Sequence, residues 1–298
     1  MTKPPVRGRF APSPTGPLHF GSLIAAAGSY LNVKSAGGEW QVRIDDIDPP
    51  REVAGAADDI LRTLEAYGFE WDGDVLYQSR RRDAYETALD DLRRAQALYP
   101  CGCTRKEIAD SSVLGIEGPV YPGTCRAGLV EERSARAWRV RTRNALIEFT
   151  DGVQGLQSSI LEQDIGDFVV RRADGLYAYQ LACVVDDAEQ GMTEVVRGAD
   201  LLTSTARQIH LQHLLGLPTP AYTHLPAVLN AQGEKLSKQT RAEALSRARP
   251  VEVLWRALDF LGQNPPQAWR EARLDEFWQA ARQRWKVSMI PRRTGIVA

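Results

Sequence analysis

The sequence predicts an α/β protein built on a parallel sheet, and three observations support this fold class. In the first hundred residues, short strand-like segments alternate with longer helical segments, the order that parallel strands with helical crossovers require. Three of the four cysteines fall in one short stretch containing Gly and Pro, which predicts an inserted module. Beyond residue 238 the pattern is mainly helical.

The elements follow from periodicity and from Gly and Pro positions. In the first half, strands are predicted at 6–10, 40–44 and 75–77, and helices at 22–33, 52–67 and 81–97. After the cysteine stretch, strands are predicted at 137–141, 167–171 and 194–197, and helices at 178–187, 203–215, 251–261 and 274–285. We therefore divide the chain into the first half of a Rossmann-like domain (1–99), an insertion (100–133), the second half (134–240) and a helical C-terminal region (241–298).

The composition limits the class of protein but says little about its activity. With 43% hydrophobic and 25% charged residues, the chain resembles ordinary globular proteins. Its 37 basic and 38 acidic residues nearly cancel, so any contact with nucleic acid has to come from a local patch. No apolar run approaches the ~20 residues of a membrane span, and the N-terminus lacks a signal-peptide core. We expect a cytoplasmic monomer without a membrane partner.

The segment from Arg9 to Ser22 predicts a phosphate site. It consists of a strand end, a turn rich in Pro and Gly, and a helix start. A helix N-terminus presents N–H groups and a positive dipole end, and Gly21 lets a base or phosphate approach the backbone. His19 adds a hydrogen-bond donor. For a histidine taken alone, the more common case is a loop shaped by Pro and Gly in which His19 packs locally.

A second segment, Lys235-Leu236-Ser237-Lys238-Gln239, lies more than two hundred residues downstream. Lysines on a loop can stabilise the charge that develops on a departing pyrophosphate. By itself, however, such a loop is more often a solvated surface turn.

Together the two segments resemble the His-x-Gly-His and Lys-Met-Ser-Lys-Ser signatures of class I aminoacyl-tRNA synthetases. Ser22 stands in place of the last His and Gln239 in place of the last Ser, so one imidazole of the general pattern is missing. The resemblance implies activation of an amino acid by ATP, with Mg²⁺ as the counter-ion. It assigns catalysis to His19, Lys235 and Lys238, and ATP binding to His19, Gly21, Ser22 and Lys238.

Three further segments, at 9–16, 43–48 and 195–200, resemble the glutamyl group of this family. A glutamate substrate carries two carboxylates, which arginines can pair with, and one ammonium group. The resemblance implies a glutamate site made of Arg9, Ala11, Ser13, Asp45, Tyr179 and Arg197. Asp45 departs from the Glu of the family pattern and is one methylene shorter. The alternative is that these charges form ordinary surface ion pairs.

The cysteine stretch contains Cys101-x-Cys103 followed by Tyr121-x-x-x-Cys125. Three thiolates can fill three corners of a tetrahedral zinc site, but the spacing alone leaves the metal reading open. The fourth cysteine, Cys183, stands in an apolar run and is expected to be buried.

The pattern of three Cys and one Tyr resembles the zinc module of short paralogues of glutamyl-tRNA synthetase. Two further features strengthen the resemblance: segment 48–52, and the short stretch after the lysine loop (235–239). The ~60 residues of that stretch are too few for an anticodon-binding domain of usual size. The resemblance implies zinc bound by Cys101, Cys103, Tyr121 and Cys125. It also implies activation of glutamate without tRNA, then transfer to queuosine in the anticodon of tRNA(Asp). The alternatives are a truncated synthetase charging tRNA(Glu) and an idle tRNA-binding accessory protein.

Overall fold

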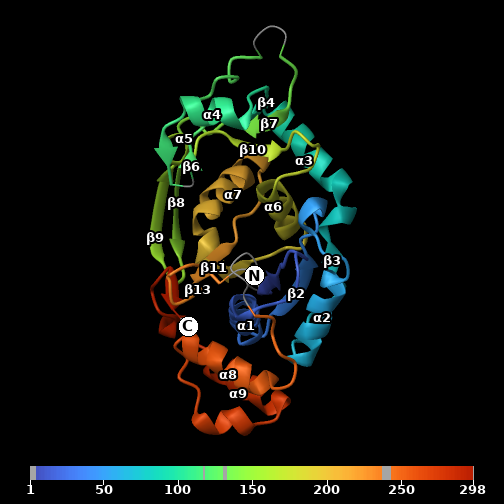
Figure 1. Cartoon of the computed structure of the whole chain (residues 1–298), viewed down its shortest axis with the longest axis vertical. Helices are drawn as coiled ribbons and strands as arrows, with labels where there is room; N and C mark the ends of the chain where they lie inside the picture. Colours follow the sequence, from blue (N-terminus) through green and yellow to red (C-terminus); the bar gives the residue numbers. More distant parts are fainter. Residues whose placement is uncertain (1–4, 117, 130–132, 237–242, 298) are drawn as a thin grey trace.

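The computed structural model describes residues 5–116, 118–129, 133–236 and 243–297. Figure 1 shows an elongated molecule in which the central sheet and its helices occupy the middle. The cysteine-containing module lies at one end and the C-terminal helices lie at the other (Figure 1). None of the described helices is both long and apolar enough to cross a membrane.

The central sheet has five parallel strands in the order β12-β11-β1-β2-β3. The strands are β1 (Arg7–Phe10), β2 (Glu39–Ile44), β3 (Leu76–Tyr77), β11 (Glu194–Gly198) and β12 (Ala221–Leu225). The connecting helices are α1 (Phe20–Lys34), α2 (Ala56–Ala66), α3 (Arg82–Arg94), α6 (Tyr179–Glu189) and α7 (Leu202–Leu215). The parallel sheet with helical crossovers confirms the predicted α/β fold class.

Helix α1 packs very closely on the sheet. It is rich in Ala and Leu, and most of its side chains are buried in the main core. A Cβ on Gly28 would lie 2.4 Å from Leu225 Cδ1, a distance that real Cβ atoms do not adopt. The absence of a side chain at this position therefore sets how near α1 lies to β12.

Two helices are shorter than their periodicity predicts, for local reasons. The helix predicted at 52–67 begins only at Ala56, because Gly55 before it adopts φ 76°, outside the helical region. The helix predicted at 81–97 ends at Arg94, and Gln96 follows with φ 53°. Such residues stop a helix whatever the apolar pattern beyond them.

The strands predicted at 137–141 and 167–171 exist, but they do not continue the parallel sheet. They form β7 (Ala137–Val140) and β10 (Phe168–Arg171). With β4 (Leu98–Cys101) they build a separate antiparallel sheet in the order β10-β7-β4. Strand periodicity does not reveal which partner a strand chooses, and here β4 was not foreseen. The alternation of helices with strands of the parallel sheet therefore resumes only with α6 and β11.

The module that follows β4 contains short elements and one long hairpin. The short elements are α4 (Arg105–Ser111), β5 (Leu114–Gly115), β6 (Gly118–Pro119) and α5 (Leu161–Asp164). The hairpin consists of β8 (Leu146–Asp151) and β9 (Gly155–Ile160). In Figure 1 it extends from the cysteine end of the molecule toward the central sheet. At its tip, the N–H of Gly152 donates to the carbonyl of Tyr222 at 2.9 Å.

The C-terminal region packs on the main core and is not a detached unit. Its helices are α8 (Pro250–Phe260) and α9 (Leu274–Arg284), and its last strand β14 (Gly295–Val297) pairs with β13 (Ala227–Leu229). Trp278 lies edge-on to Tyr30 of α1, and its indole N–H donates to the carbonyl of Tyr67 at 2.9 Å. The short 3₁₀ helices are η1 (Pro49–Arg51), η2 (Gln78–Arg80), η3 (Ala199–Leu201), η4 (Gln267–Glu271) and η5 (Val287–Met289).

Candidate functional site

A cavity of about 440 Å³ opens where β1 and β11 end. β1 and β11 are neighbours in the sheet, but the chain continues from β1 to β2 in one direction and from β11 to β12 in the other. Open α/β sheets bind ligands at such a position. Asp45 is not part of the lining, and Lys238 lies outside the described residues. The predicted glutamate and ATP residues that line the cavity are Arg9, Ala11, Ser13, His19, Gly21, Ser22, Tyr179, Arg197 and Lys235.

The start of α1 forms one wall of this cavity, which we call the phosphate wall after the ligand predicted for it. His19 is the residue before the helix, and its ring Nδ1 accepts a hydrogen bond from the backbone N–H of Ser22 at 3.3 Å. Because Nδ1 accepts, the neutral ring carries its proton on Nε2. The helix start adds backbone N–H groups and a positive dipole end, an arrangement suited to phosphate.

Gly21 makes room for the His19 ring at this wall. A Cβ on Gly21 would lie 3.1 Å from His19 Cε1 and 3.2 Å from Nδ1, closer than ordinary contacts. We expect Gly21→Ala to raise the KM for ATP about fivefold or more, since overpacking of this kind costs about 1 kcal/mol or more. The KM for the amino acid, measured in the same ATP–pyrophosphate exchange assay, should change little. Equal effects on both constants would show that Gly21 has no particular role at the phosphate wall.

The lysine loop begins and ends beside the same wall. Lys235 lines the cavity, and its ammonium group pairs with Asp200 in the turn after β11. On the other side of the loop, Ala244 forms an isolated β-bridge with His19. The two sequence segments that predicted a nucleotide site are therefore adjacent in the fold. Residues 237–242, which include Lys238, are not described.

Arg9 belongs to a buried ionic network. Its Nε and Nη2 donate to the two carboxylate oxygens of Asp187 at 2.9 and 3.1 Å, and Arg43 Nη1 donates to the same carboxylate at 2.5 Å. All three residues are at most 4% exposed. Burial acts to raise the pKa of Asp187, but the charges of Arg9 and Arg43 outweigh it and hold that pKa well below its usual range. One carboxylate thus anchors two arginines.

Asp45 faces Arg43 instead of lining the cavity. Its Oδ1 accepts a hydrogen bond from Arg43 Nε at 2.8 Å, and the residue is 5% exposed. Burial raises the pKa of Asp45 to about 6, against the opposing charge of Arg43. The structure therefore places Asp45 in the ionic network behind the cavity, apart from the other predicted glutamate residues.

Arg197 lies on the β11 side of the cavity and is held by several neutral groups. Its Nε donates to His224 Nε2 at 3.1 Å, and its Nη2 donates to the Thr205 hydroxyl at 2.7 Å. A longer contact of 3.4 Å joins Nη1 to the hydroxyl of Tyr179, which also lines the cavity. His224 in turn contacts the carboxylate of Asp151 through Nδ1 at 2.6 Å.

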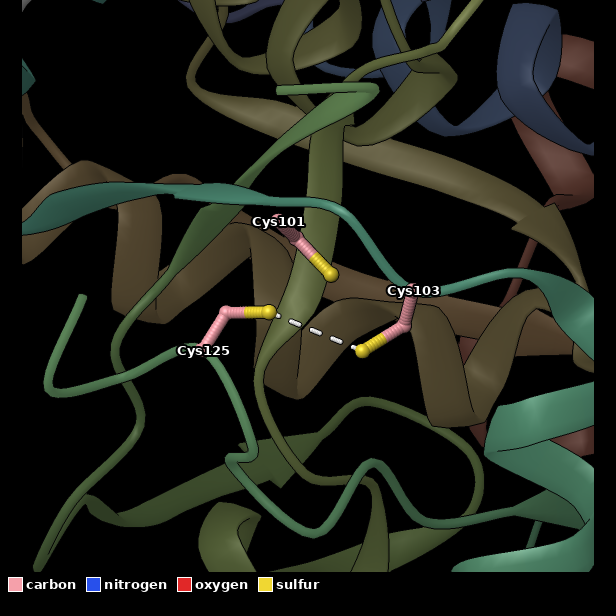
Figure 2. A group of neighbouring side chains, drawn as sticks. All are labelled: Cys101, Cys103 and Cys125. Atoms are coloured by element: carbon pink, nitrogen blue, oxygen red, sulfur yellow. Dashed lines mark hydrogen bonds between the residues drawn. The ribbon is translucent and has the colours of Figure 1, made fainter. Parts of the chain in front are cut away.

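The cysteine module brings three sulfur atoms and one phenol together. Figure 2 shows the side chains of Cys101, Cys103 and Cys125 directed toward one another. Their Sγ atoms lie within 4.8 Å of one another, with 3.6 Å between Cys103 and Cys125. The Tyr121 hydroxyl is 3.4 Å from the Sγ of Cys101 and 3.6 Å from that of Cys103. The fourth cysteine, Cys183, is buried elsewhere, as predicted.

This donor set fits a tetrahedral zinc site. A zinc ion with bonds of about 2.3 Å separates its ligand atoms by about 3.8 Å, close to the distances found here. Burial, with the neighbouring thiols, raises the pKa of Cys103 to about 11, so a divalent cation would be needed to keep the donors ionised together. The guanidinium of Arg139 lies 3.9 Å from the centre of the Tyr121 ring and adds positive charge beside these donors.

Several residues of the site were not predicted from the sequence. Asp187, Asp151 and His224 come from three distant segments, and no short motif contains them. One signal did exist: Asp186 and Asp187 follow the apolar run 181–185 within a single helix, where a carboxylate needs a cationic partner. For His224, nothing in its sequence neighbourhood distinguishes it from a histidine of the core.

Comparisons with known proteins agree with this geometry. The family described as tRNA synthetases class I (E and Q), catalytic domain, matches residues 5–254. A glutamyl-Q tRNA(Asp) synthetase of Dechloromonas aromatica (strain RCB) is 59% identical over 295 residues, which is 98% of each chain. One from Aromatoleum aromaticum (strain DSM 19018 / LMG 30748 / EbN1) is 57% identical and covers 97% of this chain and 91% of the relative.

Two solved structures share the fold. A glutamate tRNA ligase from Elizabethkingia meningosepticum CCUG26117, in complex with its amino acid, has a TM-score of 0.79 and 25% identity. The glutamate-tRNA synthetase from Elizabethkingia anophelis has a TM-score of 0.81 and 26% identity. These alignments cover 98% and 99% of this chain but only 66% and 68% of the other chains. The chain therefore belongs to the class I tRNA synthetase family for E and Q, and within it to the glutamyl-Q tRNA(Asp) synthetases.

Proposed function

We propose that this protein uses ATP to activate glutamate as glutamyl-adenylate without tRNA, and then transfers the glutamyl group to queuosine in the anticodon of tRNA(Asp). One observation carries the proposal: a single cavity is lined both by the phosphate wall at His19 and by Arg9 and Arg197, two of its three arginines. An ATP and an amino acid with two carboxylates would meet there. The names of the relatives supply the RNA acceptor.

In the first step, a carboxylate oxygen of glutamate attacks the α-phosphorus of ATP and pyrophosphate leaves. His19, Gly21, Ser22 and the start of α1 would hold the phosphates, while Lys235 and Lys238 would stabilise the charge that develops on pyrophosphate. Mg²⁺ would neutralise part of that charge. No protein nucleophile is required, so catalysis consists of positioning and electrostatic stabilisation. In the second step, a queuosine hydroxyl attacks the acyl carbon, which forms an ester and releases AMP.

For glutamate, we propose that Arg9 and Arg197 pair with its carboxylates and that Tyr179 and Ser13 add hydrogen bonds. Ala11 also lines the cavity. Asp45 would reach the ammonium group through a water molecule, because its carboxylate is bonded to Arg43 and lies outside the lining. We further propose that the protein acts as a monomer. We place its action in the cytoplasm, where its proposed tRNA substrate occurs.

The test is a pair of assays on the intact protein. Glutamate-dependent ATP–pyrophosphate exchange without tRNA measures activation, and transfer of labelled glutamate to tRNA(Asp) with and without queuosine identifies the acceptor. We expect exchange without tRNA and transfer only to the queuosine-containing tRNA. Charging of tRNA(Glu) would instead favour a shortened glutamyl-tRNA synthetase. No exchange at saturating glutamate, ATP and Mg²⁺ would favour an idle tRNA-binding protein.

We also propose that Cys101, Cys103, Tyr121 and Cys125 bind one zinc ion that stabilises the module. The distances between the donor atoms and the charge of Arg139 beside them support this. Zinc would act there as a structural ion, since a site with four protein ligands leaves no open position for a substrate.

Metal analysis tests the zinc site directly. We expect about one equivalent of zinc in the purified protein and a clear loss in Cys101→Ser, because removal of one thiolate weakens a tetrahedral site strongly. The variant should also unfold at a lower temperature. Cys183→Ser is the matched control, since Cys183 is buried apart from the cluster and should leave the zinc content unchanged. A native protein without metal would contradict the proposal.

A further inference from the structure

Behind Arg197 lies a chain of buried polar groups that leads away from the cavity. Arg197, His224 and Asp151 are 4%, 0% and 2% exposed. The contacts run from Arg197 Nε to His224 Nε2 at 3.1 Å and from His224 Nδ1 to Asp151 Oδ2 at 2.6 Å. Of these three residues only Arg197 lines the cavity. The other two touch the site through it.

The direction of each hydrogen bond in this chain is determined. Asp151 accepts backbone N–H groups from Val153, Gln154 and His224 at 2.8–3.1 Å. Burial acts to raise the pKa of Asp151, but these bonds and the one from the His224 ring keep that pKa below its ordinary value, so Asp151 is a carboxylate. Burial also lowers the pKa of His224, which favours the neutral ring. Nδ1 therefore donates to Asp151, and Nε2 is left as an acceptor for Arg197.

A second contact fixes the plane of the guanidinium. Thr205 accepts from Arg197 Nη2 at 2.7 Å, and its hydroxyl is also 3.0 Å from His224 Nε2. Nε and Nη2, the two nitrogens on one edge of the guanidinium, are thus both bonded to residues behind the cavity. The remaining nitrogen, Nη1, has its contact with Tyr179, a residue that lines the cavity. A planar group held through two of its nitrogens presents the third in one direction only.

The anchor of this chain is the tip of the β8–β9 hairpin. Asp151 ends β8, and the amide of Gln154 donates to the carbonyl of His224 at 2.9 Å. A Cβ on Gly152 would lie 2.5 Å from the Thr223 hydroxyl, so the tip is packed directly on β12. The hairpin therefore contributes to the position of a cavity residue without reaching the cavity.

We propose that His224, oriented by Asp151 and assisted by Thr205, is a positioning residue that aims Arg197 at one carboxylate of the amino-acid substrate. The inference rests on the proposed function, in which Arg197 binds that carboxylate. It assigns part of the preference for an acidic amino acid to residues that never contact it. Loss of the acceptor at Nε2 would leave Thr205 as the main support of Arg197 behind the cavity, and the guanidinium would be aimed less well.

Two substitutions of His224 separate its two contacts. In His224→Asn the amide can replace Nδ1 opposite Asp151, but it is too short to reach Arg197. In His224→Gln the longer amide can replace Nε2 and accept from Arg197. In ATP–pyrophosphate exchange, we expect His224→Asn to raise the KM for glutamate about tenfold, the loss of roughly one good hydrogen bond to a charged group. The KM for ATP and the kcat should stay close to wild type, and His224→Gln should restore most of the glutamate affinity.

The controls distinguish this inference from the function on which it rests. His210 is another buried histidine, bonded to the carbonyl of Arg141 at 2.8 Å and outside the cavity lining, and His210→Asn should leave the glutamate KM unchanged. If Arg197→Ala also leaves that KM unchanged, Arg197 does not bind glutamate and the proposed site is wrong. If Arg197→Ala raises the KM but a folded His224→Asn does not, the positioning role alone is overturned.

A third variant covers the case in which His224→Asn does not fold. Thr205→Val keeps the shape of the side chain and removes the acceptor for Arg197 Nη2. It should raise the glutamate KM while the KM for ATP is kept. An unchanged glutamate KM in this variant would overturn the positioning of Arg197 from behind the cavity.

Discussion

Asp187→Ala is expected to lower the free energy of unfolding by about 3–5 kcal/mol, because it leaves two buried guanidinium groups without their shared counter-charge. Arg9 and Arg43 are 3% and 0% exposed, and both donate to this carboxylate. The glutamate KM should rise as well, since Arg9 lines the cavity and loses its anchor. Urea unfolding followed by tryptophan fluorescence, together with exchange kinetics, measures both effects.

A matched surface substitution shows whether burial of the ion pairs causes the loss of stability expected for Asp187→Ala. Asp91→Ala removes an exposed pair with Arg94 and should cost less than about 1 kcal/mol. Arg9 and Arg43 hold the pKa of Asp187 down despite its burial, so its stabilising effect is present above the ordinary Asp pKa of about 3.9 and is lost as the pH falls further. The difference between wild type and Asp187→Ala should accordingly shrink in acid. Similar losses for Asp187→Ala and Asp91→Ala at neutral pH would contradict the buried network.

Lys238→Ala is expected to slow ATP–pyrophosphate exchange about 10²- to 10³-fold at saturating substrates, the usual effect of removing one preorganised group from a developing charge. The assignment rests on the sequence signature and on Lys235, which lines the cavity at the start of the same loop. The rate constant is measured with saturating glutamate, ATP and Mg²⁺. Thermal unfolding of the variant then shows that the fold is kept.

Two further variants test whether the effect depends on the positive charge and on the position of Lys238. Lys238→Arg keeps the positive charge and should recover part of the rate. Lys106→Ala removes an exposed lysine of α4, outside the cavity, and should have no effect on exchange. If Lys238→Ala exchanges within about threefold of wild type, the lysine loop does not stabilise the leaving pyrophosphate.

Features encoded in contiguous residues were predictable from the sequence. The run from Arg9 to Ser22 contains a strand end, a turn and a helix start, so its local chemistry implied a phosphate wall before any tertiary contact was known. Cys101 and Cys103 stand two residues apart at the end of β4, and Cys125 follows within the same short module, beyond α4, β5 and β6. In both cases the chain distance is small, and spacing limits the possible geometry.

Features that depend on pairing between distant segments were not predictable. Arg9 and Asp187 are 178 residues apart, and His224 lies 73 residues from Asp151. No local rule specifies such partners, because a buried charge can be neutralised by any segment that packs against it. The same reason explains the antiparallel sheet of β4, β7 and β10, whose strands were partly foreseen while their partners were not.

The tight seat of α1 on the sheet has a consequence for nucleotide binding. Gly28 contacts Leu225 where no side chain fits, and it lies nine residues, or about 13 Å of helix, from the phosphate wall at His19. A methyl group added at Gly28 would push α1 away from Leu225 and displace the N-terminus of the helix. Gly28→Ala would therefore weaken the affinity for ATP, although residue 28 does not line the cavity.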